Sequence, residues 1–186
     1  MISKDYEIEL RILKLREKRR RKRFFLGLLL WCGAIWVIAY LLFGIALVEG
    51  NSMRPTFLPG DLVLYRRSVQ TSVDYNDIVI LNTGFHGEII KRIVGKPGDV
   101  LEVDEKGHLI RNGKEVREPE ILFGNQTAGD GVTFPYTVPD GMYFYLGDNR
   151  PVSMDSRLLG AASGEEIRGK VIALFRFGNW GKKTRG

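Results

Sequence analysis

The most restrictive feature of this 186-residue chain is an uncharged, apolar run over residues 24–48, FFLGLLLWCGAIWVIAYLLFGIALV. A helix of this length extends about 37 Å, more than the roughly 30 Å hydrocarbon core of a bilayer. A cleavable signal peptide is the alternative, but its apolar region is only about 7 to 15 residues long and ends at a small-residue cleavage site. Ala46-Leu47-Val48 is a poor version of such a site. We therefore expect residues 24–48 to form an uncleaved transmembrane helix.

The positive charge of the chain is concentrated just before this run. Residues 1–23 hold ten Lys and Arg against four Asp and Glu, which accounts for the whole net charge of +6, so that residues 24–186 are neutral overall. A basic block beside a membrane span indicates a cytoplasmic N-terminus and contact with anionic lipid headgroups, rather than a nucleic-acid site. We expect residues 1–23 to be a cytoplasmic N-terminus and residues 49–186 to be extracytoplasmic.

Residues 49–186 have the pattern of a β domain. Short apolar runs between turn residues predict strands at 62–65, 78–81, 88–94, 100–103, 109–116, 142–146 and 170–177. Within 109–116, Asn112-Gly113 suits a type I′ hairpin turn. Residues 118–135 are predicted to form a surface loop, and the only helical turn expected is a short one near 164–167. The predicted fold is mainly β, with an N-terminal transmembrane helix followed by an all-β domain of antiparallel sheets.

The counts of cysteine and histidine exclude several kinds of site. A single Cys allows no intramolecular disulfide and no multi-cysteine metal site. The two histidines, His86 and His108, have no partner motif around them and are interpreted as surface residues. With only these two histidines, the chain has almost no residues that could form a histidine metal centre or a Ser-His-Asp triad.

Ser52 is the first candidate for chemistry, because it follows the apolar run closely and lies in a segment framed by Pro55 and Pro59. Taken alone, such a serine is usually a solvated loop hydroxyl. A nucleophile at this position would reach only substrates presented at the bilayer.

Lys91 is the second candidate. In a strand, Ile89, Lys91 and Ile93 share one face, so that the lysine has apolar neighbours. One interpretation is an edge-strand lysine whose ammonium reaches water. The other is a desolvated general base: lowering its pKa from ~10.4 to near 7 requires about 4.6 kcal/mol, which burial can supply. A neutral lysine could then take the proton of a serine.

The third candidate is the polar segment 147–157, GDNRPVSMDSR, which follows the apolar residues 142–146. It contains two acids, two arginines, an asparagine and two serines. A network of buried ion pairs is the default explanation for such a density of polar groups. In either case, the segment could order a site around it.

Four segments together resemble the conserved boxes of type I bacterial signal peptidases, in the order of that family: 52–56, 60–64, 91–99 and 147–157. The single apolar span resembles the shorter Gram-positive type. The resemblance implies Ser52 as nucleophile, Lys91 as general base, and Ser153 as the hydroxyl that hydrogen-bonds and orients the lysine. It also implies a supporting set of ion-pair residues, namely Asp148, Asp155, Arg157 and Arg92.

The resemblance further implies a membrane-bound serine endopeptidase that removes N-terminal signal peptides from secreted precursors after small residues of the Ala-x-Ala type. The precursor is expected to add as a strand along residues 88–90, with Met53, Ile89 and Ile90 lining shallow pockets that reject large side chains. Neither a metal nor a cofactor is expected. The expected partners are signal-peptide-bearing precursors and the lipid bilayer, without nucleic acid, and the expected location is the cell membrane.

Three departures from the family pattern are visible, one of which is Phe57 in place of the usual leucine after the Pro-Thr pair. Gly50 stands where one branch has a second serine that helps to bind the oxyanion, which leaves that role to the backbone N–H of Ser52 and a neighbour. Leu158-Leu159 replaces a common aromatic pair.

Two other functions are compatible with parts of the sequence. A catalytically silent relative could act as a chaperone or assembly factor for exported proteins or pili, although the chain retains both Ser52 and Lys91. A self-cleaving regulator could use a similar Ser-Lys pair, but such proteins are soluble and carry a DNA-binding domain, which residues 1–48 do not supply.

Overall fold

The computed structural model describes residues 4–67, 73–84, 87–117 and 131–176. The chain divides into two compact units, Met1–Leu42 and Phe43–Gly186, and each is described by itself. His86 and residues 118–130 of the predicted surface loop lie outside the described residues. Residues 131–135 of that loop are in neither a helix nor a strand.

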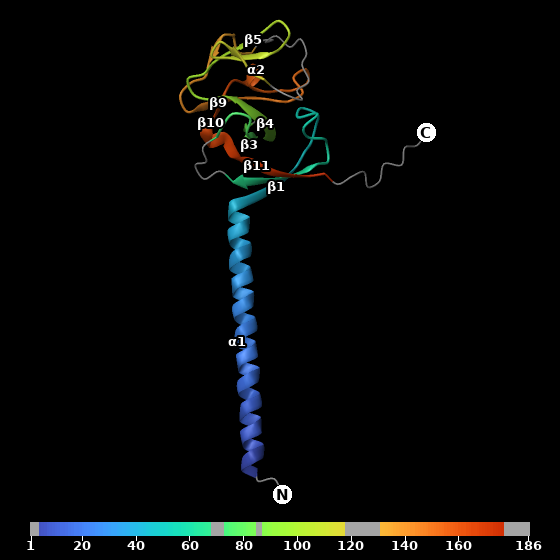
Figure 1. Ribbon diagram of the computed structural model, residues 1–186, viewed down its shortest axis with the longest axis vertical. Coiled ribbons are helices and arrows are strands. Elements are labelled where there is room, and N and C mark those ends of the chain that lie inside the picture. Colours follow the sequence, from blue (N-terminus) through green and yellow to red (C-terminus); the bar gives the residue numbers. More distant parts are fainter. Residues whose placement is uncertain (1–3, 68–72, 85–86, 118–130, 177–186) are drawn as a thin grey trace, which may run out of the picture. The chain divides into compact units, whose positions relative to one another are not determined.

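The first unit is a single long helix, α1, over Lys4–Leu42 (Figure 1). The basic block is part of this helix and continues without interruption into the apolar segment. The helical segment Arg16–Leu42 is long and apolar enough to cross a membrane. The described side chains of this stretch are almost all exposed, which fits a helix whose apolar surface is not covered by protein.

The predicted helix over 24–48 is wrong at its C-terminal end, because α1 stops at Leu42 and Phe43–Leu47 forms strand β1. Strand β1 pairs antiparallel with β2, which spans Leu62–Arg67. Gly44 lies opposite Tyr65, and a Cβ added at Gly44 would collide with the tyrosine ring. A short apolar run fits both a helix and a strand, so that pairing with β2 decides its structure.

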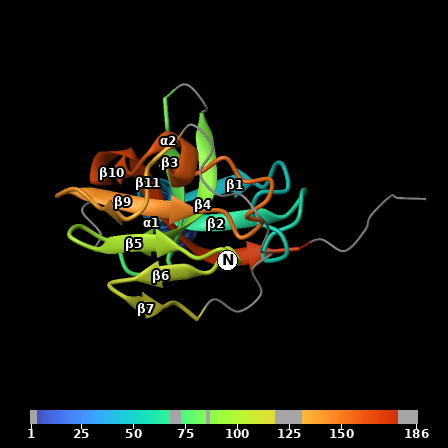
Figure 2. The same ribbon diagram turned by 90° about the horizontal axis from the view of Figure 1, so that it is seen from above.

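The second unit contains two antiparallel sheets, as predicted. In the described residues, the larger sheet has the order β1-β2-β11-β3-β4-β9-β10 and the smaller one the order β7-β6-β5-β8. Figure 2 shows β5, β6 and β7 of the smaller sheet side by side. The remaining strands of the larger sheet are β3 Ile78–Asn82, β4 Glu88–Gly95, β9 Met142–Leu146, β10 Ala162–Ser163 and β11 Ile167–Phe175. The smaller sheet consists of β5 Val100–Val103, β6 Leu109–Arg111, β7 Lys114–Glu115 and β8 Tyr136–Thr137.

The predicted strands agree with these elements, whereas the short strands β1, β8 and β10 were not predicted. The β6–β7 hairpin turns at Asn112 and Gly113, whose φ angles of 52° and 73° are both positive, as a type I′ turn requires. Two short helices interrupt the strands: a 3-10 turn over Gly164–Glu166, close to the predicted turn, and α2 over Ser156–Leu159, which was not predicted.

The larger sheet buries side chains on both faces, and one face supports the segment that carries Ser52. Val79 and Leu81 of β3 belong to one apolar cluster, whereas Ile80 between them belongs to another. The second cluster also contains Met53 and Phe57, which are almost completely buried. These two side chains anchor the loop between β1 and β2 onto the sheet.

We expect Gly44→Ala to destabilise the protein by about 1–3 kcal/mol, because the new methyl group must displace the buried ring of Tyr65. Gly164→Ala is the matched control, since its Cβ would meet the nearest atom at an ordinary 3.6 Å. Thermal unfolding of the full-length protein in detergent measures both effects. Equal stability of the two variants would contradict the close approach of β1 and Tyr65.

Candidate active site

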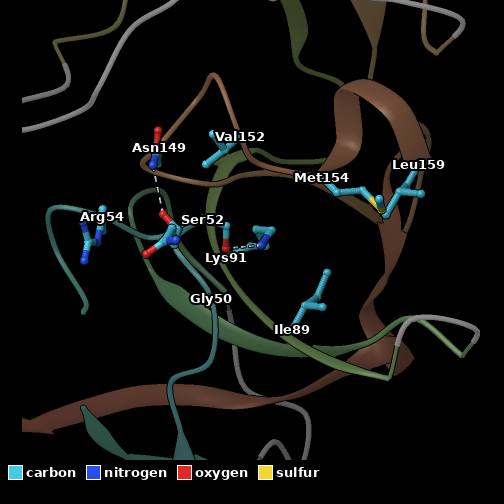
Figure 3. A pocket seen from close by; sticks show the side chains of 10 residues that line it. Gly50, Ser52, Arg54, Ile89, Lys91, Asn149, Val152, Met154 and Leu159 are labelled. Carbon is cyan, nitrogen blue, oxygen red and sulfur yellow. Dashed lines mark hydrogen bonds between the residues drawn. The ribbon is translucent and has the colours of Figure 1, made fainter. Parts of the chain in front are cut away.

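Ser52 and Lys91 lie in direct contact, although 39 positions separate them in the sequence. Lys91 occupies the centre of β4, paired with Val79 of β3, and Ser52 lies in the turn segment between β1 and β2. The Lys91 Nζ donates a hydrogen bond of 2.8 Å to the Ser52 Oγ (Figure 3). Strand pairing and the buried Met53 therefore bring a hydroxyl and an amine together.

The environment of Lys91 favours its neutral form. The side chain is only 4% exposed, and this burial lowers the pKa of Lys91 below its ordinary value of 10.5. The carboxylates of Asp155 and Asp148 act in the opposite direction and are the weaker influence. A neutral amine in contact with a hydroxyl can accept its proton, which a protonated lysine cannot do.

Backbone hydrogen bonds close the loop that carries Ser52 and tie it to the segment after β9. The Val48 N–H donates to the Asp61 carbonyl, and the Gly60 N–H donates to the Val48 carbonyl, at 2.8 and 2.9 Å. The Asn149 N–H donates to the Ser52 carbonyl at 2.9 Å. Ser52 is thus held both by its own loop and by the polar segment 147–157.

A buried ion pair connects this polar segment to β4. Arg92 donates two hydrogen bonds to Asp148, with its Nε 2.8 Å from Oδ1 and a terminal nitrogen 2.7 Å from Oδ2. Asp148 is fully buried and also accepts a hydrogen bond from the Thr56 hydroxyl. One carboxylate therefore joins the strand of Lys91 to the loop of Ser52.

A second ion pair orders the polar segment itself. The Asp155 carboxylate accepts hydrogen bonds from the Arg157 guanidinium at 2.9 and 3.0 Å, and from the Gly147 N–H at 3.0 Å. Arg157 in turn donates to the Arg150 carbonyl at 2.7 Å. Asp155 is also the N-cap of α2. Together, these hydrogen bonds give most polar groups of the segment a partner.

Ser153 lies beside the site but does not make the predicted hydrogen bond to Lys91. Its buried hydroxyl has no hydrogen-bond partner in the part of the chain that the structure describes. The hydroxyl packs against Gly147, where an added Cβ would collide with it and would lie 2.6 Å from the Ser52 carbonyl oxygen. The structure thus places this hydroxyl against the Gly147 backbone, without a hydrogen bond to the lysine.

Two cavities flank the contact between Ser52 and Lys91. The larger has a volume of about 520 Å³, and the smaller about 170 Å³. Both are lined by Ser52, Lys91 and Ile89. The smaller cavity lies between residues 47–49 and β4, and all three predicted pocket residues line it: Met53, Ile89 and Ile90.

Asp61 and Arg176, which are 115 positions apart, form an ion pair that was not predicted from the sequence. The Arg176 guanidinium donates to the buried Asp61 carboxylate at 3.0 and 2.7 Å and to the Thr56 carbonyl at 3.2 Å. These bonds hold the pKa of Asp61 below its ordinary value. Gly60 and Asp61 begin one of the four segments that resemble the family boxes, but no local signal identifies an arginine at the end of β11 as the partner of Asp61.

Of the two histidines, only His108 lies in the part of the chain that the structure describes. His108 contacts Asp104, with its Nδ1 2.9 Å from the carboxylate. Within the described ranges, no group of three or more His, Cys, Asp or Glu side chains is arranged to hold a metal ion.

We expect Arg176→Gln to lower the free energy of unfolding near pH 7, because it leaves the buried Asp61 carboxylate without its charged partner. The lowered pKa of Asp61 means that its contribution is present above the ordinary aspartate pKa and is lost as the pH falls through the folded value. The difference between variant and wild type should therefore shrink towards pH 3.

Denaturant unfolding of the full-length protein in detergent, at pH 7 and pH 3, measures this difference. Arg66→Gln is the matched control, because Arg66 is exposed on β2. A loss at pH 7 that is no greater for Arg176→Gln than for the control would contradict the role of the pair.

Comparisons with known proteins agree on one family. The family model for signal peptidase, peptidase S26, matches residues 21–176. Signal peptidase I P of Bacillus subtilis subsp. natto is 36% identical over 157 residues, which cover 78% of this chain and 84% of that protein. Signal peptidase I S of Bacillus subtilis strain 168 is 36% identical over 175 residues, covering 85% and 94%. A crystal structure of a signal peptidase I from Enterococcus faecalis V583 aligns with a TM-score of 0.46 and 29% identity, covering 55% of this chain and 98% of that one.

Proposed function

Because the chain belongs to the signal peptidase family, peptidase S26, and is therefore a serine peptidase, we propose that it is membrane-bound and removes signal peptides with a dyad of Ser52 and Lys91. The observation that carries this proposal is the 2.8 Å hydrogen bond between the two side chains, in which the lysine is buried. Burial gives the amine the lowered pKa that a general base needs.

In the proposed reaction, the Ser52 Oγ attacks the scissile carbonyl while the neutral Lys91 amine takes the hydroxyl proton. The resulting ammonium then gives this proton to the leaving amine, and an acyl-enzyme remains. A water molecule, activated by the same amine, hydrolyses the ester and regenerates Ser52. Since Gly50 has no side chain, the backbone N–H of Ser52 is the proposed donor to the oxyanion.

The precursor is proposed to bind as an added strand on β4. In the described registers, β3 pairs with β4 from Glu88 to Arg92, whereas β9 pairs with β4 only from Arg92 onward. The backbone of residues 88–91 is therefore available on the side of β9. Side chains alternate along a strand, so that the first and third residues before the scissile bond point into the same cavity. The small cavity at Met53 and Ile90 fits the short side chains of an Ala-x-Ala sequence.

Two features support membrane binding with a cytoplasmic N-terminus. The helix α1 contains the apolar stretch that can span a bilayer, preceded by the cluster of arginines and lysines. Within the second unit, Leu47, Leu62 and Phe175 align across three neighbouring strands, and Leu47 and Phe175 are about half exposed. We propose that this apolar sheet face contacts lipid.

We expect Ser52→Ala and Lys91→Ala each to reduce cleavage of a signal-peptide-bearing precursor by at least about 10³-fold, because each removes one half of the dyad. A gel assay with the purified full-length protein measures this loss, and circular dichroism checks that the variants are folded. The control Lys114→Ala, at an exposed position on β7, should cleave at the wild-type rate.

Retained activity in either dyad variant would contradict the assignment of that residue. A folded wild-type protein that cleaves no precursor would instead favour a catalytically silent relative that acts as a chaperone or assembly factor.

The pH dependence of cleavage should report the lowered pKa of Lys91. Activity is expected to rise with pH as the lysine loses its proton, with a midpoint below the ordinary value of 10.5. The activity of Lys91→Arg should not show this rise with pH, since a guanidinium stays protonated. Initial rates between pH 5 and 10 test both statements, and a wild-type midpoint near 10.5 would contradict the desolvated base.

A further inference from the structure

The larger cavity beside Ser52 has a cationic end and an apolar end. In Figure 3, Arg54 and Asn149 lie on one side of Ser52, whereas Ile89, Met154 and Leu159 lie on the other. All five line this cavity. A peptide that crosses Ser52 therefore passes from an apolar environment to one that contains a guanidinium.

The direction of this passage follows from the proposed function, on which the inference rests. Residues before the scissile bond pair with the free edge of β4, which includes Ile89 at the apolar end. The chain beyond the scissile bond must then leave on the other side of Ser52. This part of the precursor, which contains the first residues of the mature protein, therefore passes Arg54 and Asn149.

Arg54 is held close to the nucleophile, and its charge is available. It follows Ser52 by two positions, its N–H donates to the Asn51 carbonyl at 3.2 Å, and Pro55 follows it. Its side chain is exposed and contacts no carboxylate in the described part of the chain. The backbone around Arg54 is thus restrained, while its guanidinium remains free to bind a ligand.

The charges that line the two cavities are arranged asymmetrically. The larger cavity is lined by Arg54 and Lys91 and by no acidic side chain, and Lys91 carries the lowered pKa described above. The smaller cavity is lined instead by the carboxylates of Glu49 and Glu88. The field that the departing part of the peptide meets is therefore positive, and Arg54 supplies it.

We propose that Arg54 is a specificity-determining residue that binds an acidic side chain among the first three residues after the scissile bond and disfavours lysine or arginine there. An exposed pair of this kind changes kcat/KM by about two- to fivefold. The preference should fall as salt screens the interaction over a Debye length that shrinks to about 3 Å at 1 M salt.

The test uses full-length protein in detergent and precursors that share one signal sequence. Asp, Asn or Lys is placed in turn at the first, second and third positions after the scissile bond, and kcat/KM is measured in 50 mM and 1 M NaCl. At low salt we expect Asp to exceed Lys by about fivefold or more at one or more positions, since attraction of one and repulsion of the other combine. At high salt the ratio should approach one.

Two variants assign the preference to Arg54. Arg54→Glu should reverse the order of Asp and Lys, and Arg54→Gln should bring their ratio to about one. Lys114→Glu makes a comparable charge change on β7, at a residue that lines neither cavity, and should keep the wild-type order.

Two outcomes would overturn the inference. Equal rates for Asp and Lys at all three positions, with the Asn precursors cleaved normally, would exclude the cationic subsite and leave the dyad intact. A preference that persists in both Arg54 variants would show that another group causes it. Failure of the wild type to cleave any precursor would instead contradict the proposed function.

Discussion

The site depends on the removal of one lysine amine from water. Burying an ammonium ion is costly, and the cost falls when the group is neutral and hydrogen-bonded. At Lys91 the Ser52 hydroxyl provides that hydrogen bond. Asp155 and Asp148 raise the pKa of Lys91, but each carboxylate is bound by an arginine, Arg157 or Arg92. Because of these two ion pairs, the carboxylates raise the pKa of Lys91 less than burial lowers it.

The pair of Asp148 and Arg92, together with the pair of Asp61 and Arg176, also determines where the hydroxyl lies. Asp148 binds Arg92, next to the lysine, and Thr56, four positions after the serine. Arg176 then binds the Thr56 carbonyl and Asp61, at the far end of the same loop. A loop without regular secondary structure is therefore fixed at several points by buried charges. The apolar packing of Met53 and Phe57 fixes how closely this loop lies against the larger sheet. Because such networks act as a unit, the position of Ser52 depends on strands that are distant in the sequence.

Sequence alone predicted the parts that local pattern determines. The period of two placed Lys91 on one face with Ile89 and Ile93, and the Asn-Gly pair predicted the hairpin at Asn112. The end of α1 was not predictable in this way, because residues 43–47 are equally apolar and only their pairing with β2 makes them a strand. The partner of Asp61 and the contact of Ser153 with Gly147 depend on tertiary structure, which has no local signature.

In the proposed function, confinement to the bilayer compensates for a shallow recognition site. A pocket that selects a small side chain gains only about 1–3 kcal/mol for each methylene that it distinguishes, and the cavity at Met53 and Ile90 is small. An enzyme and a precursor that share one membrane meet at a high effective concentration, so that little further binding energy is needed. Most of the precursor can then vary freely. Selectivity then depends on the few precursor residues that touch the site. Before the scissile bond the site selects by side-chain size, and after it Arg54 selects by side-chain charge.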